Sequence, residues 1–215
     1  MKIKIIIADD HKIVRDGITS LLEREKDIEV IGSVDNGRAA YNLAKECKPD
    51  VVIMDIFMEG LNGILATKQI TTDMPGSKIL ILSMFSEKKY VHEAFQAGAM
   101  GYLLKDCAYE ELAKAIRALY KNQNYLSQKI TNLMVENFVH KGVDLASSAC
   151  AELSIREKEV LQLIAEGVST KDIAKSLHVS IKTVESHRKK IMDKLDIHTV
   201  AGLTKYALRE GLVSE

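Results

Sequence analysis

The sequence predicts two domains of different class, a five-stranded, doubly wound parallel α/β domain followed by a small all-α bundle. In residues 1–120, short apolar runs alternate five times with segments of helical periodicity. Residues 121–151 lose this alternation and are typical of a linker with one helical segment. In residues 152–215 there are no strand signals, and four helical segments follow one another. The chain therefore predicts an N-terminal α/β domain, a partly helical linker and a C-terminal helical domain.

Five apolar runs in the first domain have the length of strands. Several are rich in Ile or Val and apolar almost throughout, as strands covered on both faces must be. The predicted strands are Ile3–Ala8, Ile28–Val34, Val51–Met54, Ile79–Leu82 and Tyr102–Leu104. The helical segments between and after them are Ile13–Glu25, Arg38–Cys47, Gly63–Thr72, Lys88–Ala97 and Tyr109–Leu119. Gly, Pro, Asn and Asp mark the joints, which completes the pattern of a doubly wound sheet.

The C-terminal domain begins with a helix-start signal. Ser154 precedes an apolar stripe and Glu157 follows three residues later, which is the pattern of a capping box. Gly167 is expected to end this first helix. Three further helical segments follow, and the third helix of the set, "IKTVESHRKKIMDKL", combines an apolar stripe with basic residues. Such a helix can lie in the major groove of DNA and contact phosphates at its margins.

Composition limits the class and compartment of the protein. Hydrophobic residues make up 47% of the 215 and charged residues 28%, as in ordinary globular proteins, and the formal net charge is zero. The three cysteines, Cys47, Cys107 and Cys150, lie far apart, which argues against a disulfide framework and against zinc. The N-terminal run "IKIIIA" is too short for a signal peptide or a membrane span. We expect a cytoplasmic protein with no membrane partner.

Charged and polar residues are expected to meet at one edge of the sheet. Ligands bind beyond the carboxyl ends of the strands in open parallel sheets. Asp9 and Asp10 follow the first strand, Asp55 the third, Ser83 the fourth and Lys105 the fifth. Clustered carboxylates favour a hard cation such as Mg²⁺, and a phosphoryl group on Asp55 would also satisfy the hydroxyl and the amine. Each side chain alone also fits a solvated strand end, a helix cap or a surface charge.

The strings "IIIADDH", "VVIMD", "ILS" and "GYLLK" resemble, in order and spacing, the receiver domain of two-component response regulators. The resemblance covers residues 1–120 and implies that Asp55 accepts a phosphoryl group from a histidine kinase. It also implies that Asp10, Asp55 and the carbonyl of Phe57 hold Mg²⁺, with Asp9 acting through water.

The same resemblance assigns roles in switching. Lys105 would pair with the phosphoryl group, and Ser83 would move to hydrogen-bond it. Tyr102 would be the aromatic residue that swings inward on activation, although half-buried packing fits it equally well.

The string "LSIREKEVLQLIAEGVSTKDIAKSLHVSIKTVESHRKKIMDKL" resembles the helix-turn-helix of the NarL/FixJ (LuxR-type) regulators. By that resemblance Ile181–Leu195 is the recognition helix, and the last helix, with Val200, Leu203 and Lys205, pairs two DNA-bound copies. A glutamate facing a base edge could accept from a cytosine amine. The residues expected to face base edges are Glu185, Ser186 and Lys189, and those expected near phosphates are Lys182, Thr183, His187 and Lys190.

The joint expectation is a phosphorylation-activated transcriptional regulator that is not an enzyme. Its expected partners are a sensor histidine kinase, a double-stranded operator and, once phosphorylated, a second copy of itself. The alternative is a constitutive dimeric transcription factor that works without phosphate. A phosphatase like the haloacid dehalogenases would need Asp-x-Asp after the first strand, but His11 stands two places after Asp9. A flavin carrier would need a Ser/Thr/Gly phosphate loop there.

Neighbours of Asp55 suggest two further expectations. Phe57 and Phe85 would form apolar walls on two sides of the site and hinder hydrolytic water, which predicts a long-lived phosphorylated form. The glutamate at position 59 is a feature in which the chain resembles the cell-envelope-stress regulators of the LiaR and VraR type, although a solvated loop acid is the simpler interpretation.

Overall fold

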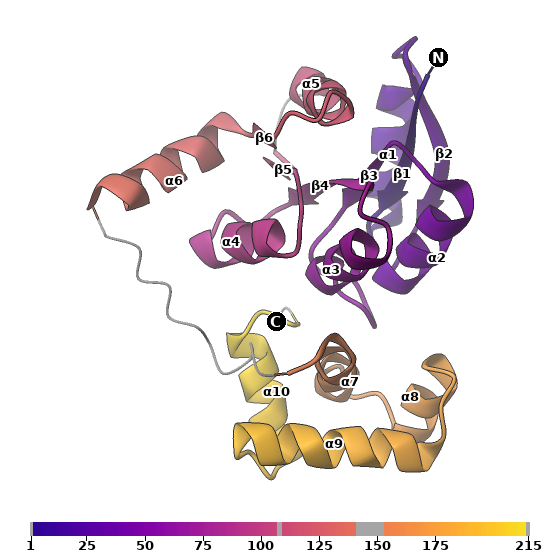
Figure 1. The fold of residues 1–215 in the computed structure, drawn as a ribbon, viewed down its shortest axis with the longest axis vertical. Coiled ribbons are helices and arrows are strands. Elements are labelled where there is room, and N and C mark those ends of the chain that lie inside the picture. Colours follow the sequence, from indigo (N-terminus) through magenta and orange to yellow (C-terminus); the bar gives the residue numbers. More distant parts are fainter. Residues whose placement is uncertain (1, 107–108, 141–152, 214–215) are drawn as a thin grey trace. The chain divides into compact units, whose positions relative to one another are not determined.

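The computed structural model describes residues 2–106, 109–140 and 153–213. The chain divides into two compact units, an α/β unit from the N-terminal part and a helical unit from the C-terminal part (Figure 1). The predicted division into a parallel α/β domain and an all-α domain is therefore confirmed. Within the described residues, no helix is long and apolar enough to cross a membrane.

The sheet of the N-terminal unit is parallel, with the strand order β2-β1-β3-β4-β5-β6. All five predicted strands form, with ends that differ from the prediction by at most one residue. The strands are β1 (Ile3–Ala8), β2 (Ile28–Val34), β3 (Val51–Met54), β4 (Lys78–Ser83), β5 (Gly101–Leu104) and β6 (Tyr125–Leu126).

The prediction of five strands is wrong by one, because β6 lies in the segment expected to be a linker. β6 has two residues, too few for an alternating pattern to be seen in sequence. It pairs through Tyr125 with Gly101 and through Leu126 with Tyr102. The Ser127 backbone N–H then donates to the Tyr102 carbonyl at 3.1 Å. The start of the predicted linker is thus hydrogen-bonded to strand β5.

Helices cover both faces of the sheet, as the alternating sequence pattern requires (Figure 1). One face packs against α1 and α5 in a continuous core that includes Ile5, Ile53 and Leu103. The other face is covered by α2, α3 and α4, which contact one another in that order. The helices are α1 (Lys12–Leu22), α2 (Gly37–Cys47), α3 (Gly63–Asp73), α4 (Lys88–Gln96), α5 (Tyr109–Tyr120) and α6 (Gln128–His140).

Helix α6 confirms that residues 121–151 contain a helical segment. Its Ile130 is fully buried, whereas Val135 is 56% exposed. The Gly- and Ser-containing part of the predicted linker, residues 141–151, lies outside the described residues.

The C-terminal unit contains the four predicted helices, α7 (Ile155–Ala165), α8 (Thr170–Ser176), α9 (Ile181–Leu195) and α10 (Val200–Arg209). The predicted capping box is present, since the Ser154 side chain accepts from the Glu157 backbone and the Glu157 side chain accepts from the Ser154 backbone. Gly167 ends α7 at a φ of 79°, a conformation that favours glycine. Ser169, Ser180 and Thr199 cap the other three helices.

Buried residues of all four helices form the core of this unit, among them Val160, Ile173, Val184, Ile191 and Leu203. One ion pair ties α7 to α9: Lys194 Nζ lies 2.7 Å from Glu157 Oε2, and the Glu157 side chain is 6% exposed. The carboxylate that caps α7 therefore also fixes the C-terminal end of α9.

Candidate functional site

The carboxyl ends of four strands position the polar groups of the N-terminal unit. Asp9 follows β1, Asp55 follows β3, Ser83 ends β4 and Lys105 follows β5. β1 and β3 are neighbours although β2 lies between them in sequence, so the strand order reverses here and creates a ligand-binding edge. Asp9, Asp55 and Ser83 are all buried, at 2%, 6% and 0% exposure. The buried, apolar carboxyl-terminal halves of these strands thus lead to buried polar groups.

Lys105 joins two of the acids. Its Nζ lies 2.7 Å from Asp9 Oδ2 and 2.7 Å from Asp55 Oδ2. Burial alone would lower the pKa of Lys105, but attraction and hydrogen bonds from Asp55 and Asp9 outweigh burial and raise it. The predicted meeting of Asp9, Asp55 and Lys105 at this edge is present in the structure.

The Asp55 carboxylate is held in an unfavourable environment. Burial raises its pKa from 3.8 to about 6, against the opposing attraction and hydrogen bond of Lys105. The other carboxylate oxygen, Oδ1, accepts from the Ile56 backbone N–H at 2.8 Å. A carboxylate that is charged, buried and only partly compensated gains from any added positive charge.

The local charge balance fits a divalent cation. Three carboxylates, Asp9, Asp10 and Asp55, meet a single Lys105, which leaves two negative charges uncompensated when the imidazole of His11 is neutral. Ligand atoms of the three acids and of His11 all lie within 4.8 Å of one another. Carboxylate oxygens at a partly open rim are the ligands that Mg²⁺ takes. Asp9, Asp10 and Asp55 therefore form an acidic pocket consistent with a Mg²⁺ site.

Ser83 and Tyr102 are linked through the backbone of Phe85. The Phe85 N–H donates to Ser83 Oγ at 3.2 Å, and the Tyr102 hydroxyl donates to the Phe85 carbonyl at 2.7 Å. Tyr102 is fully buried, so its ring already points inward in this structure. Burial raises the pKa of Tyr102 well above its usual value, which keeps the hydroxyl protonated as a donor.

Phe57 and Phe85 do not form two separate walls. Their ring centroids lie 4.7 Å apart in an edge-to-face arrangement, and Tyr90 of α4 packs on both, at 5.4 and 5.6 Å. Side chains from three segments thus form one aromatic cluster of Phe57, Phe85 and Tyr90. The expectation of two opposed walls was wrong because the loops after β3 and β4 are neighbours, so their aromatic residues meet.

In the C-terminal unit, α9 presents a basic outer face. Five of the residues expected to contact DNA, Lys182, Glu185, Ser186, Lys189 and Lys190, are exposed, and Thr183 and His187 are half-buried. The Nδ1 atom of His187 is buried and has no hydrogen-bond partner within the described parts of the chain. Val184 and Ile191 face the core as expected, but Ile181 is 48% exposed and does not belong to the buried stripe.

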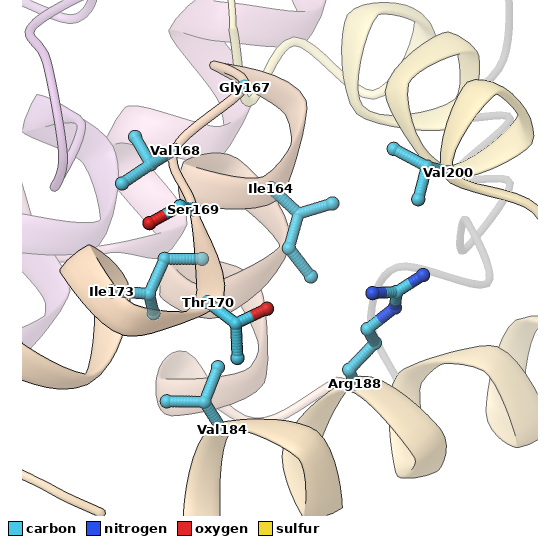
Figure 2. A pocket seen from close by; sticks show the side chains of 9 residues that line it. All are labelled: Ile164, Gly167, Val168, Ser169, Thr170, Ile173, Val184, Arg188 and Val200. Atoms are coloured by element: carbon cyan, nitrogen blue, oxygen red, sulfur yellow. The ribbon is translucent and has the colours of Figure 1, made fainter. Parts of the chain in front are cut away.

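Two further basic residues of α9 lie away from the outer face. Lys194 pairs with Glu157, and Arg188 points toward Val200 of α10 at a pocket of about 180 Å³ (Figure 2). Apolar side chains form most of this pocket, with the hydroxyls of Ser169 and Thr170 beside them. The cationic groups left to face a partner along α9 are therefore Lys182, Lys189 and Lys190.

Comparison with known proteins shows the family. A profile described as the response regulator receiver domain matches residues 5–117, and one described as bacterial regulatory proteins, luxR family, matches residues 151–207. The chain is similar to the oxygen regulatory protein NreC of Staphylococcus haemolyticus (strain JCSC1435), with 44% identity over 214 residues, 98% of this chain and 99% of the relative. The chain is a two-component response regulator of the NarL/FixJ family.

Solved structures of response regulators agree with this. The RcsB response regulator of Salmonella typhimurium matches with a TM-score of 0.60 and 31% identity, covering 95% of this chain and 97% of that one. A structure described as two RcsB dimers bound to two parallel DNAs matches with a TM-score of 0.59 and 31% identity, covering 96% and 98%. This response regulator is a DNA-binding transcription factor and not an enzyme.

Sequence reasoning missed two features of the response regulator's receiver site. Nothing in the sequence indicates that Tyr90 lies near the site, because it stands in an ordinary amphipathic helix and reaches the site only by packing on Phe57. His11 was not among the predicted site residues, but its imidazole lies beside Asp10. Its position directly after the paired acids was the available signal.

Proposed function

We propose that Asp55 accepts a phosphoryl group from a sensor histidine kinase and that this modification raises the affinity of the dimer for operator DNA. The observation that carries the proposal is the geometry around Asp55. The carboxylate is buried, its nearest cation is Lys105 at 2.7 Å, and two further acids stand beside it. These positions support a role for Asp55 as the nucleophile, with Lys105 as its counter-ion and the neighbouring acids as the metal site.

The transfer step follows from these groups. An Asp55 carboxylate oxygen attacks the phosphorus, the bond from phosphorus to the donor histidine nitrogen breaks, and that nitrogen leaves with the electron pair and takes up a proton. Lys105 then pairs with the new phosphoryl oxygens in place of the lost carboxylate charge. Mg²⁺ held by Asp10, Asp55 and the Phe57 carbonyl, with Asp9 acting through water, would neutralise charge on the transferred group.

Switching would pass through the backbone of Phe85. A phosphoryl group on Asp55 adds acceptor oxygens that compete for the Ser83 hydroxyl, which now accepts from the Phe85 N–H. Moving Ser83 toward that group would change the Phe85 segment, to which Tyr102 is bound. Tyr102 is already buried, so it would not need to swing inward on activation. The segment around Phe85, which is hydrogen-bonded to Tyr102, would move instead.

Intact-mass measurement tests the phosphorylation. Acetyl phosphate with Mg²⁺ should add one phosphoryl group to the wild-type protein and none to Asp55→Ala. A phosphoryl group on the variant, or none on the wild type, would refute the assignment of Asp55.

Sizing by light scattering, with and without beryllofluoride, tests the alternative of a constitutive dimer. We expect a shift from monomer to dimer in wild type and no shift in Asp55→Ala. A dimer of unchanged size in both conditions would favour the phosphorylation-independent function.

The basic outer face of α9 is proposed to enter the major groove, with Glu185, Ser186 and Lys189 facing bases. Lys182, Thr183, His187 and Lys190 would lie near phosphates. His187 would use Nε2, because its Nδ1 is buried. The α10 face with Val200, 43% exposed, and Lys205 would pair two DNA-bound copies. The prediction that Leu203 belongs to this face was wrong, because Leu203 is fully buried in the core of the unit.

Selection of bound sites from random DNA would define the operator for these tests. The name of the NreC relative makes oxygen availability the first stimulus to examine.

A further inference from the structure

A pocket in the C-terminal unit combines apolar walls with one unpaired cation. Its volume is about 180 Å³, and buried aliphatic side chains of three helices line it: Ile164 of α7, Ile173 of α8 and Val184 of α9. Arg188 also lines the pocket and points toward Val200 of α10 (Figure 2). We propose that this pocket binds a small organic monocarboxylate whose carboxylate pairs with Arg188. The inference does not depend on the phosphorylation of Asp55.

The Arg188 guanidinium has no counter-ion within the described part of the chain. It forms no hydrogen bond or ion pair with any of the described residues. Asp172, the acid of the neighbouring helix α8, is hydrogen-bonded to Ser169. Arg188 is half-buried, and a cation that is partly removed from water gains from an anion beside it. A carboxylate matches a guanidinium especially well, because two parallel hydrogen bonds can form between them.

The position of Arg188 on α9 separates it from the residues proposed to contact DNA. Arg188 stands one turn after Val184, which is 1% exposed, so both lie on the side of the helix that faces the rest of the unit. Lys182 and Lys189 are exposed on the outer face. A DNA phosphate would also leave the aliphatic walls of the pocket uncovered, whereas an apolar group that covers them is favoured. An anion with an apolar body therefore fits this pocket better than a phosphodiester.

The volume of the pocket limits the size of the ligand. An apolar cavity of about 150 Å³ is large enough for benzene. The volume of about 180 Å³ therefore accommodates one ring or a short branched chain, with its carboxylate at Arg188. Thr170 also lines the pocket, and its hydroxyl, which has no hydrogen-bond partner among the described residues, can donate to the second carboxylate oxygen. Benzoate meets these requirements and is the probe for the test.

Titration of the full chain with benzoate, followed by nuclear magnetic resonance, tests the proposal. The methyl resonances of Ile164 and Ile173 should shift with a dissociation constant of about 1 mM or lower. Benzamide keeps the ring but lacks the charge, and acetate keeps the charge but lacks the ring, so each should bind about tenfold more weakly. Arg188→Met, which keeps a long apolar side chain, should weaken benzoate binding about tenfold. Arg209→Met is the matched control, because it removes an arginine of the same unit that is 71% exposed and does not line the pocket.

Equal binding of benzoate and benzamide, or no saturable shift at about 10 mM benzoate, would overturn the proposal. So would unchanged benzoate binding in Arg188→Met. If this variant also lowered the salt dependence of operator binding by about one unit of the logarithmic slope, Arg188 would belong to the DNA interface instead. Since the guanidinium bonds to no other described residue, Arg188→Met is expected to fold, and circular dichroism would verify it.

Discussion

Replacing Asp55 by asparagine should stabilise the metal-free protein near neutral pH and remove part of its pH dependence. Burial raises the pKa of Asp55 from 3.8 to about 6, so the folded state holds a proton that the unfolded state has released over this interval. Stability must then fall as pH rises from about 4 through about 6. Each unit of pKa shift corresponds to 1.36 kcal/mol, so the raised pKa of Asp55 lowers the free energy of unfolding at pH 7 by about 3 kcal/mol relative to its value at low pH. Roughly 1 kcal/mol of this stability is lost between pH 5 and pH 7.

Urea unfolding in a metal chelator, repeated at pH 5, 6 and 7, measures this effect. The free energy of unfolding of wild type minus that of Asp55→Asn should fall by roughly 1 kcal/mol from pH 5 to pH 7, because the other titrating groups cancel in the difference. The control is Asp16→Asn, which changes an exposed aspartate of α1. The free energy of unfolding of wild type minus that of Asp16→Asn should be the same at all three pH values. A difference that stays constant or rises with pH would refute the inferred electrostatics of Asp55.

Four other outcomes are expected. Mg²⁺ at about 100 times its dissociation constant should stabilise the wild type by about 2.7 kcal/mol and Asp55→Asn by much less, measured by thermal unfolding. Gly63→Ala should cost several kcal/mol, because an added Cβ would lie 1.7 Å from the Asp55 carbonyl oxygen, whereas Gly17→Ala meets nothing within 4 Å and should be neutral or stabilising by about 0.5–1 kcal/mol; equal melting temperatures would contradict this. Glu157→Ala should cost about 2–3 kcal/mol by urea unfolding, since it removes the carboxylate half of the capping box of α7 and the ion pair to α9, and a loss below about 0.5 kcal/mol would show that neither interaction contributes. Phe57→Asn should shorten the lifetime of phosphorylated protein, followed by intact mass, because the aromatic cluster beside the site is opened to water; hydrolysis of the wild type within seconds, or an unchanged rate in the variant, would disprove the shielding.

Much of the receiver site was predictable from the sequence because parallel strands place their carboxyl ends at one edge. Mostly apolar strands lead directly to Asp9, Asp55 and Lys105, and parallel strands of one sheet bring these three positions to the same edge. The pairing of Lys105 with both acids then follows from charge. Helix starts were equally predictable where a side chain caps the helix, as Ser154 does.

Other features depend on packing between distant segments and left little trace in the sequence. Strand β6 has only two residues and exists because the backbone of Tyr125 and Leu126 pairs with β5. Ile181 belongs to the apolar stripe by spacing, yet the first turn of α9 extends beyond the core and exposes it. The partners of Lys194 and the direction of Arg188 depend on where α7 and α10 lie against α9. Periodicity identifies the buried face of a helix, but it does not show which basic side chains beside that face contact other helices of the same unit.

The most direct test of phosphorylation control is a DNA-binding titration on a selected operator. Acetyl phosphate and Mg²⁺ should raise the affinity of the wild-type protein and leave that of Asp55→Ala at the unphosphorylated level, with both proteins measured at the same salt concentration. An equal rise in the variant, or no rise in wild-type protein that carries the phosphoryl group, would contradict the claim that phosphorylation of Asp55 controls DNA binding.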